Sequence, residues 1–231
     1  MAHDTPTAPD DPSTRDEDPT EHVPPRPGRR LRRDECEARV TAFDRLAVPD
    51  TGTRRAAVAL AVVTDDDGSR LLLTRRPPKM RAHAGQFALP GGSIDPGETP
   101  EDAAVRELAE ELGVQAGADS VLGLLDDYVT RSGFVITPVV VWLGEPDGPI
   151  VPNPDEVAVV FEVGMEEVDV DPLIQPVPGA PDGSAPFLRW PFRGGAMFAP
   201  TAALIHQFRE VVLHGRGTRV AEFAQPDFAA R

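Results

Sequence analysis

Three glutamates lie close together on one predicted helix, and their spacing is the strongest chemical signal in this sequence. Glu107, Glu110 and Glu111 stand at positions i, i+3 and i+4, where helical side chains are neighbours with Cβ atoms about 5–6 Å apart. Their negative charges repel one another unless a cation lies among them. Mg²⁺ prefers oxygen ligands and typically combines one or two carboxylates with water and substrate phosphate oxygens. The cluster therefore predicts a Mg²⁺ or Mn²⁺ site.

The helix that carries these acids has recognisable ends. Thr99, followed three residues later by Asp102, resembles a capping box, Pro100 falls at the first helical position, and Gly113 provides a C-terminal stop. Between these ends lies an apolar stripe at helical spacing, formed by Ala104, Val105, Leu108 and Leu112. We expect the stripe to pack in the core, while the three glutamates lie largely off it and face a site.

The segment from Gly92 to Val114 resembles the Nudix box, whose pattern is G-x5-E-x7-R-E-U-x-E-E-x-G-U with U an aliphatic residue. Every fixed position is filled, by Gly92, Glu98, Arg106, Glu107, Leu108, Glu110, Glu111, Gly113 and Val114. Seven positions of single identity, at residue frequencies of roughly 7% each, coincide by chance about once in 10⁸ start sites. The alternative, an acidic helix face in contact with solvent, does not explain the matching glycine and Glu98 in the loop.

This resemblance implies a fold of the α/β class, the Nudix α/β/α sandwich with a mixed sheet. It also implies that Glu107, Glu110 and Glu111 bind the divalent cation. Gly92 enters the helix without a side chain, so its backbone carbonyl is a further candidate ligand. Glu107 is the candidate for a second, catalytic role, in which it orients the attacking water.

Three other residues of the box have expected structural roles. Arg106 is expected to pair with a carboxylate, for which Glu98 is the candidate, and so to fix the loop against the helix. Gly113 ends the helix. Glu98 is therefore interpreted as structural and not catalytic.

Nudix enzymes often use an additional acid from outside the box, and Glu156 is our candidate for the catalytic base or an extra ligand. It lies in an Asn-Pro-Asp-Glu loop before an expected strand. Asp126, Asp127 and Asp155 are rival candidates. The alternative that Glu156 is a solvent-facing loop acid also stays open.

The run upstream of the box, residues 72–92, resembles the signature of coenzyme A pyrophosphatases, a Nudix subgroup. Pro77 stands where that subgroup has serine, and Leu89 where it has phenylalanine. The positions that agree are Leu72, Leu73, Thr74, Arg75, Arg81, His83, Gly85 and Pro90-Gly91-Gly92.

The same run supplies candidate substrate contacts. Arg75, Arg81 and His83 are expected to bind a substrate phosphate or the adenosine portion, because arginine offers bidentate contacts to phosphate. Arg76 and Lys79 are expected to be surface charges.

The function implied is metal-dependent hydrolysis of a pyrophosphate bond in a nucleoside diphosphate derivative. Coenzyme A or an acyl-CoA is the expected substrate, with adenosine 3′,5′-bisphosphate and 4′-phosphopantetheine as products. Two alternatives stay open. One is a Nudix hydrolase for NADH, ADP-ribose or a nucleotide sugar, and the other is a non-catalytic Nudix domain that binds a regulatory ligand.

Composition limits the partners. The 231 residues carry a formal net charge of −15, which disfavours nucleic acid and anionic membranes and leaves small-molecule nucleotides as the expected partners. Cys36 is the single cysteine, so an intrachain disulfide is excluded. No apolar run reaches the roughly 20 residues that a membrane helix needs, and no secretion signal is evident. We expect a cytoplasmic protein and allow for a homodimer.

Residues 1–33 form an acidic, proline-rich tail that we expect to be disordered, residues 34–50 a short helical lead-in, and residues 51–231 the Nudix domain. Apolar β-branched runs predict the strands, and the proline- and glycine-rich segment 164–186 is predicted to be a long loop. The predicted strands are 56–63, 70–76, 121–130, 134–143, about 157–163 and about 187–192, with a final helix over about 200–214.

Overall fold

Strands and helices follow one another along the chain in the computed structural model, which describes residues 28–79, 85–145, 148–176, 185–193 and 195–225. The helices are α1 (Arg33–Ala42), α2 (Pro100–Leu112), the 3-10 helix η2 (Ala118–Ser120), α3 (Met165–Val168), α4 (Thr201–Phe208) and the π-helical turn η3 (Arg209–Leu213). The strands are β1 (Arg54–Asp65), β2 (Gly68–Arg75), β3 (Phe87–Ala88), β4 (Gly91–Ser93), β5 (Val121–Leu124), β6 (Tyr128–Val129), β7 (Phe134–Gly144), β8 (Val159–Gly164), β9 (Leu173–Gln175), β10 (Phe187–Phe192) and β11 (Gly195–Phe198).

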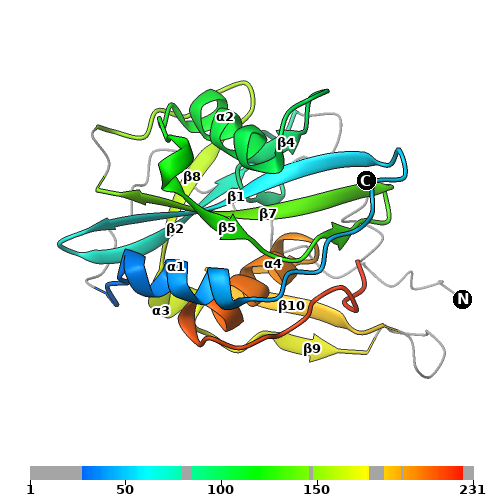
Figure 1. Ribbon diagram of the computed structural model, residues 1–231. Coiled ribbons are helices and arrows are strands. Elements are labelled where there is room, and N and C mark those ends of the chain that lie inside the picture. The colour runs from blue at the N-terminus through cyan, green and yellow to red at the C-terminus, as the bar shows by residue number, and fades with distance from the viewer. Residues whose placement is uncertain (1–27, 80–84, 146–147, 177–184, 194, 226–231) are drawn as a thin grey trace, which may run out of the picture.

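Eight of these strands form one mixed sheet. Its central path is β3-β2-β1-β7-β5, with β4 paired to β1, β6 to β7 and β8 to β2. β1 and β7 run parallel, whereas β2 and β4 run antiparallel to β1. Helix α2 covers one face of this sheet, and α1 and α4 lie on the other (Figure 1). The predicted α/β sandwich with a mixed sheet is confirmed.

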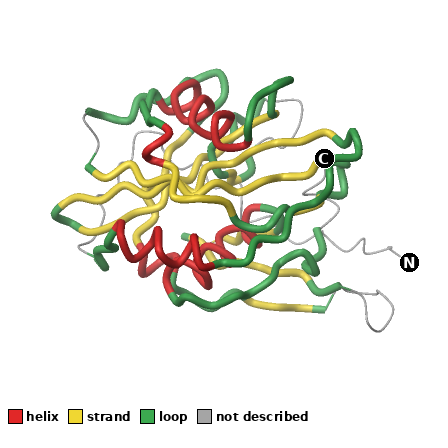
Figure 2. Tube along the Cα trace, viewed as in Figure 1, coloured by secondary structure: helices red, strands yellow, loops and turns green. Residues whose placement is uncertain are grey.

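Strand β1 separates two hydrophobic cores. Side chains alternate between the faces of a strand, and on β1 the alanines 57, 59 and 61 lie in the core beneath α2, while Leu60 and Val62 lie in the larger core beneath α1 and α4. The small side chains allow α2 to approach the sheet closely. Layers of helix, strand and helix follow from this division (Figure 2).

Most strands correspond to the sequence predictions, but two segments differ. The run 121–130 is divided into β5 and β6, because Asp126 and Asp127 turn inward between them, where both are buried. The prediction of a long loop over 164–186 is wrong for its described part, which contains α3 and β9. β9 joins β10 and β11 in a second, three-stranded sheet.

Both ends of the described chain pack on the larger core. Leu31 and Cys36 lie in the same cluster as Val220 and Phe223. Residues 1–27, most of the predicted tail, lie outside the described residues. Among the helices that are described, none combines the length and apolar character needed to cross a membrane.

Asp127 anchors the segment between α1 and β1 to the sheet. Its carboxylate accepts hydrogen bonds from Arg45 (2.7 Å), Arg55 (2.8 Å) and Thr137 (2.7 Å), and one from the Val48 N–H (2.8 Å). Burial alone would raise the pKa of Asp127, but these hydrogen bonds outweigh it and hold the pKa below its ordinary value. The carboxylate is therefore charged at neutral pH and joins the segment 45–55 to β7.

We predict that Asp127→Ala lowers the free energy of unfolding by about 3–5 kcal/mol, because it leaves two arginines without their buried partner. Asp66→Ala is the control, since the Asp66 side chain is fully exposed, and should change stability by no more than about 0.5 kcal/mol. Urea denaturation followed by circular dichroism measures both. Equal stability of the two variants would contradict the anchoring role.

Candidate active site

Helix α2 has the ends that its sequence predicts. The Asp102 N–H donates to the Thr99 hydroxyl (3.1 Å), Pro100 occupies the first turn, and Gly113 closes the helix in the left-handed conformation at φ 67°. Glycine adopts this conformation without the steric cost that a Cβ brings. These caps fix the ends of α2 at Pro100 and Leu112. The acidic residues between them therefore have a defined position against the strands.

The three clustered glutamates have different environments. The Glu110 side chain is 55% exposed and that of Glu107 is 12% exposed, whereas Glu111 is 5% exposed as a whole residue. Glu111 is one of the buried residues of α2, together with Leu108 and Leu112. The prediction that all three acids lie largely off the packing side is thus wrong for Glu111. The buried surface of α2 is wide enough to include this side chain next to the apolar stripe.

Among the described residues, the positively charged side chain that contacts Glu107 and Glu110 is Arg106. Its guanidinium donates to both carboxylate oxygens of Glu98 (2.9 and 3.1 Å), to Glu107 (2.8 Å) and to Glu110 (2.9 Å). It also reaches the backbone carbonyl of Ser93 (3.0 Å). The predicted pairing of Arg106 with Glu98 is confirmed. Arg106 relieves the repulsion between Glu107 and Glu110 and joins the loop to the helix.

Two glycines bring the strand β4 against the carboxylates. A Cβ on Gly92 would lie 2.2 Å from Glu107 Oε1, so the absence of a side chain allows this contact. The Gly91 N–H donates to Glu111 Oε2 at 3.3 Å. Backbone groups of β4 thus lie beside the two more buried acids.

Burial makes these acids hard to ionise. It raises the pKa of Glu111 to about 8, and repulsion from Glu107 contributes to this. Burial also raises the pKa of Glu107, and repulsion from Glu110 and Glu156 adds to the effect against the opposing contacts of Arg106. The neighbouring protein groups therefore do not fully offset the negative charge of ionised Glu107 and Glu111.

Glu156 lies within electrostatic reach of both acids, since its charge raises the pKa of Glu107 and of Glu111. Its loop is tied to the end of α2, where the Asn153 N–H donates to the Glu111 carbonyl (2.8 Å) and the Val151 N–H to the Leu112 carbonyl (2.9 Å). The loop therefore brings Glu156 beside the box acids, although 45 residues separate Glu156 from Glu111 in sequence.

Two of the rival acids are occupied elsewhere. Asp127 belongs to the anchor described above, and Asp126 binds Gln207 (2.8 Å) and Arg219 (2.8 Å). Asp155 is exposed, and its own N–H donates to the Asn153 side chain (3.1 Å). Of the candidates from outside the box, Glu156 is the one whose charge acts on the pKa values of both buried glutamates.

Of the three predicted substrate residues, Arg75 lies within the described part of the chain. Arg81 and His83 lie outside the described residues. Arg75 follows Leu71 and Leu73 by the two-residue period of β2, and these leucines lie in the core beneath α1 and α4. The same period predicts that the Arg75 side chain points away from the face of the sheet that carries α2.

Arg76 was expected to be a surface charge, but it is only partly exposed. It has the register of Leu72, which lies in the core beneath α2, and its Nε is buried without a hydrogen-bond partner. Its positive charge lowers the pKa of Glu111 against the larger effects of burial and of Glu107. The sequence could not reveal this, because β2 is buried on both faces and either face could have carried the site. Lys79 is exposed, as expected.

The donor set fits a hard divalent cation. It consists of carboxylate and backbone oxygens, with two acids whose pKa values are raised by burial and mutual repulsion, and such ligands suit Mg²⁺ or Mn²⁺. Glu107 and Glu111, with the β4 backbone at Gly92, are the groups that would hold it. Within the described residues, no three His, Cys, Asp or Glu side chains converge on one point, and Arg106 engages Glu110 from the other side.

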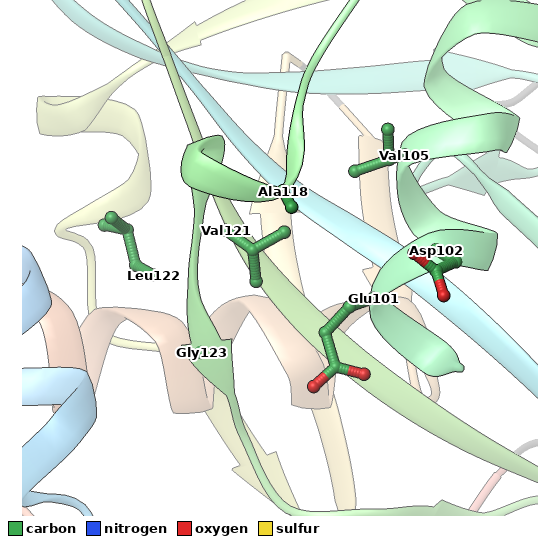
Figure 3. Close-up of a pocket in the computed structure, with 7 residues that line it drawn as sticks. All are labelled: Glu101, Asp102, Val105, Ala118, Val121, Leu122 and Gly123. Atoms are coloured by element: carbon green, nitrogen blue, oxygen red, sulfur yellow. The ribbon is translucent and has the colours of Figure 1, made fainter.

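A separate hollow of about 280 Å³ lies between α2 and the segment from η2 to β5 (Figure 3). Glu101 and Val105 line it from the helix, and Glu107 is turned about 200° from Val105 around the helix axis. The hollow is therefore on a different flank of α2 from the buried acids. Its carboxylates, Glu101 and Asp102, disfavour a phosphate ligand there.

Comparison with known proteins gives a family match. A family model described as NUDIX domain matches residues 53–190, more than half of the chain. Nudix hydrolase 3 from Caenorhabditis elegans is 35% identical over 127 residues, which are 54% of this chain and 53% of that protein. The uncharacterized Nudix hydrolase NudL from Cronobacter sakazakii is 42% identical over 115 residues, 49% of this chain and 59% of that protein. The chain thus spans a little over half of the length of these relatives.

Solved structures give matches over a similar part of the chain. A MutT protein from Methanosarcina mazei Go1 has a TM-score of 0.40 at 21% identity, covering 55% of this chain and 83% of that one. A Nudix hydrolase from M. smegmatis, RenU, has a TM-score of 0.39 at 32% identity, covering 49% of this chain and 71% of that one.

The two glycines of β4 allow a matched test. Gly92→Ala should fold, because its new Cβ meets only the flexible end of Glu107, but displacement of that carboxylate should weaken Mn²⁺ binding about tenfold or more. Gly91→Ala should instead lower the free energy of unfolding by about 1–3 kcal/mol, because its Cβ would lie 2.3 Å from the Ala57 carbonyl oxygen. Calorimetric Mn²⁺ titration and urea denaturation separate the two effects. Unchanged Mn²⁺ affinity in Gly92→Ala would contradict the proposed cation ligands.

The raised pKa of Glu111 predicts how stability depends on pH. In the folded protein without metal this pKa is about 8, against about 4.3 in an unfolded chain. Between these values the folded state holds a proton that the unfolded state has released, so the free energy of unfolding should fall as pH rises from 5 to 8. Glu111→Gln should flatten this slope. Urea denaturation in EDTA at several pH values tests this, and equal slopes for the two proteins would refute it.

Proposed function

Since the chain belongs to the NUDIX domain family, we propose that it is a divalent-cation-dependent hydrolase of a diphosphate bond in a nucleoside diphosphate derivative. The observation that carries this proposal is a pair of acids, the buried Glu111 and the partly buried Glu107, held against the backbone of β4 with Glu156 in electrostatic reach. Without a cation such an arrangement is unfavourable for the ionised acids, because burial and mutual repulsion oppose their negative charge. A catalytic requirement for a cation explains why it is present.

The cation site in this proposal consists of Glu107, Glu111 and the backbone at Gly92, with Glu110 as an exposed additional ligand. When bound, the divalent cation offsets charge on the diphosphate and lowers the pKa of an attacking water. The acids of this chain contribute by losing their protons on binding, which the raised pKa of Glu111 makes dependent on pH.

The remaining residues have positioning and proton-transfer roles. Arg106 holds Glu98 and the two flanking box acids through charge-assisted hydrogen bonds, so Glu107 keeps one orientation. Glu156 is the proposed general base that accepts the proton of the attacking water. Its exposure suits this role, because an exposed carboxylate exchanges the accepted proton with solvent. Glu107 orients the water from the helix side.

Coenzyme A or an acyl-CoA is the proposed substrate. What supports it is the sequence run 72–92, which resembles the coenzyme A pyrophosphatase signature immediately before the box. Cleavage would release adenosine 3′,5′-bisphosphate and 4′-phosphopantetheine. NADH, ADP-ribose or a nucleotide sugar contains the same diphosphate group and is the alternative within the same reaction class.

A non-catalytic ligand-binding domain is the candidate from a different class. It would bind nucleotide but would have no need of three intact box glutamates and an additional acid beside them. Incubation of the purified protein with Mg²⁺ or Mn²⁺ and each of these compounds, followed by mass spectrometry of the products, distinguishes the candidates. Cation-dependent release of phosphopantetheine supports the coenzyme A proposal, and binding without any product supports the regulatory one.

Single substitutions of the box acids test the catalytic assignment. We expect Glu107→Gln and Glu111→Gln each to lower kcat by at least about 100-fold, because each removes a cation ligand while keeping the shape of the side chain. Glu101→Gln is the matched control, since Glu101 lines the separate hollow on another flank of α2, and should keep its activity. Normal turnover in Glu107→Gln and Glu111→Gln would show that these carboxylates do not carry the reaction.

A further inference from the structure

Arg76 lies just beyond β2 on the side of the sheet that carries the box acids. The backbone N–H of Arg76 donates to the backbone carbonyl of Gln86 (3.0 Å), and the backbone carbonyl of Arg76 accepts from the Gly85 N–H (3.1 Å). These two bonds continue the antiparallel contact between β2 and β3 just past the end of β2 at Arg75. By the two-residue period, the side chain of Arg76 has the same orientation as those of Leu72 and Thr74.

Within the described part of the chain, no group accepts a hydrogen bond from the buried Nε donor of Arg76. Nε is inaccessible to solvent and makes no hydrogen bond, and a buried N–H left in this state costs about 1–3 kcal/mol. Most arginines near the sheet are engaged, as Arg70 is with Asp65 and Glu162. An unmatched donor in this position therefore calls for a ligand from outside the chain.

Arg106, the arginine that contacts the box acids in the described part of the chain, cannot take this role without loss. Arg106 already donates to Glu98, Glu107 and Glu110, and each of these contacts helps to orient the box. Arg76 is within electrostatic reach of Glu111, since its charge acts on the pKa of that carboxylate. An anionic group bound beside Glu111 would meet the donor of Arg76 on its other side.

We propose that Arg76 binds a phosphate oxygen of the substrate diphosphate, with Nε as one of the donors. This inference rests on the proposed function, because it takes the diphosphate to lie beside Glu107 and Glu111. Guanidinium matches phosphate through two parallel N–H donors, a geometry that lysine does not offer. A fixed positive charge is needed here, because a site rich in carboxylates on a protein of net charge −15 otherwise repels an anionic substrate.

The proposal assigns substrate binding to Arg76 in place of its neighbour. Arg75 has the register of Leu71 and Leu73, on the face away from α2, and so lies on the far side of the sheet from Glu111. Two adjacent arginines thus have different roles because a strand turns successive side chains to opposite faces. Pro77 is buried directly after them, and its ring restricts the backbone of Arg76 to extended conformations.

The test uses the full chain and methylenediphosphonate, a diphosphate mimic that is not hydrolysed, titrated by calorimetry in the presence of Mn²⁺. We expect Arg76→Gln to weaken its binding about 10- to 100-fold, as for loss of a hydrogen bond to a charged group, and Arg76→Lys to restore part of the affinity. KM for the active substrate should rise by a similar factor, with a smaller change in kcat. Arg30→Gln removes an exposed charge and serves as the control with unchanged binding.

Three results would overturn the proposal. They are wild-type affinity for methylenediphosphonate in Arg76→Gln, an equal or larger loss in Arg75→Gln, and loss of Mn²⁺ binding by Arg76→Gln in the absence of diphosphate. The last would show that Arg76 acts on the carboxylates and not on the ligand. Because binding of the mimic needs no turnover, failure of the hydrolase proposal alone would leave the predicted loss in Arg76→Gln intact.

Discussion

The buried carboxylate of Glu111 is the constraint around which the site is organised. An acid that is 5% exposed, beside a second acid on the same helix, is unfavourable unless charge or backbone donors offset it. The Gly91 N–H offers a weak contact and Arg76 a nearby positive charge. Neither neutralises the pair, which is why burial and repulsion raise the pKa of Glu111 to about 8 and why a divalent cation fits there.

The sheet places this unfavourable group accurately because its position is over-determined. The small side chains of β1 let α2 pack closely, and β4 pairs with β1 at Val58, Ala57 and Ala56, so both partners of the site are fixed to one strand. Backbone hydrogen bonds from the 151–157 loop to the end of α2 then bring Glu156 to the same place. Hydrophobic burial on both faces of β1 thus stabilises an arrangement that electrostatics alone would disperse.

Arginines form separate ion-pair networks with the acidic residues of this chain. Arg106 serves the box, while Asp127 with Arg45 and Arg55 fixes the segment between α1 and β1. The charged groups of these networks are paired with one another within the protein. They therefore stabilise the fold and do not call for an external ligand. Arg76 differs from these arginines, because its buried Nε has no hydrogen-bond partner among the described residues.

The sequence alone determined what is local. It predicted the caps of α2 and the contact of Arg106 with Glu98, since each depends on residues close in the chain, whereas the mixed sheet was expected from the resemblance to the Nudix box. It could not determine which face of β2 meets α2, that Glu111 is sunk into the core, or that the segment after α3 forms a second sheet. These depend on how layers pack and on contacts between distant residues. Only the tertiary structure therefore separated Arg76 from Arg75 and Glu156 from Asp126 and Asp127.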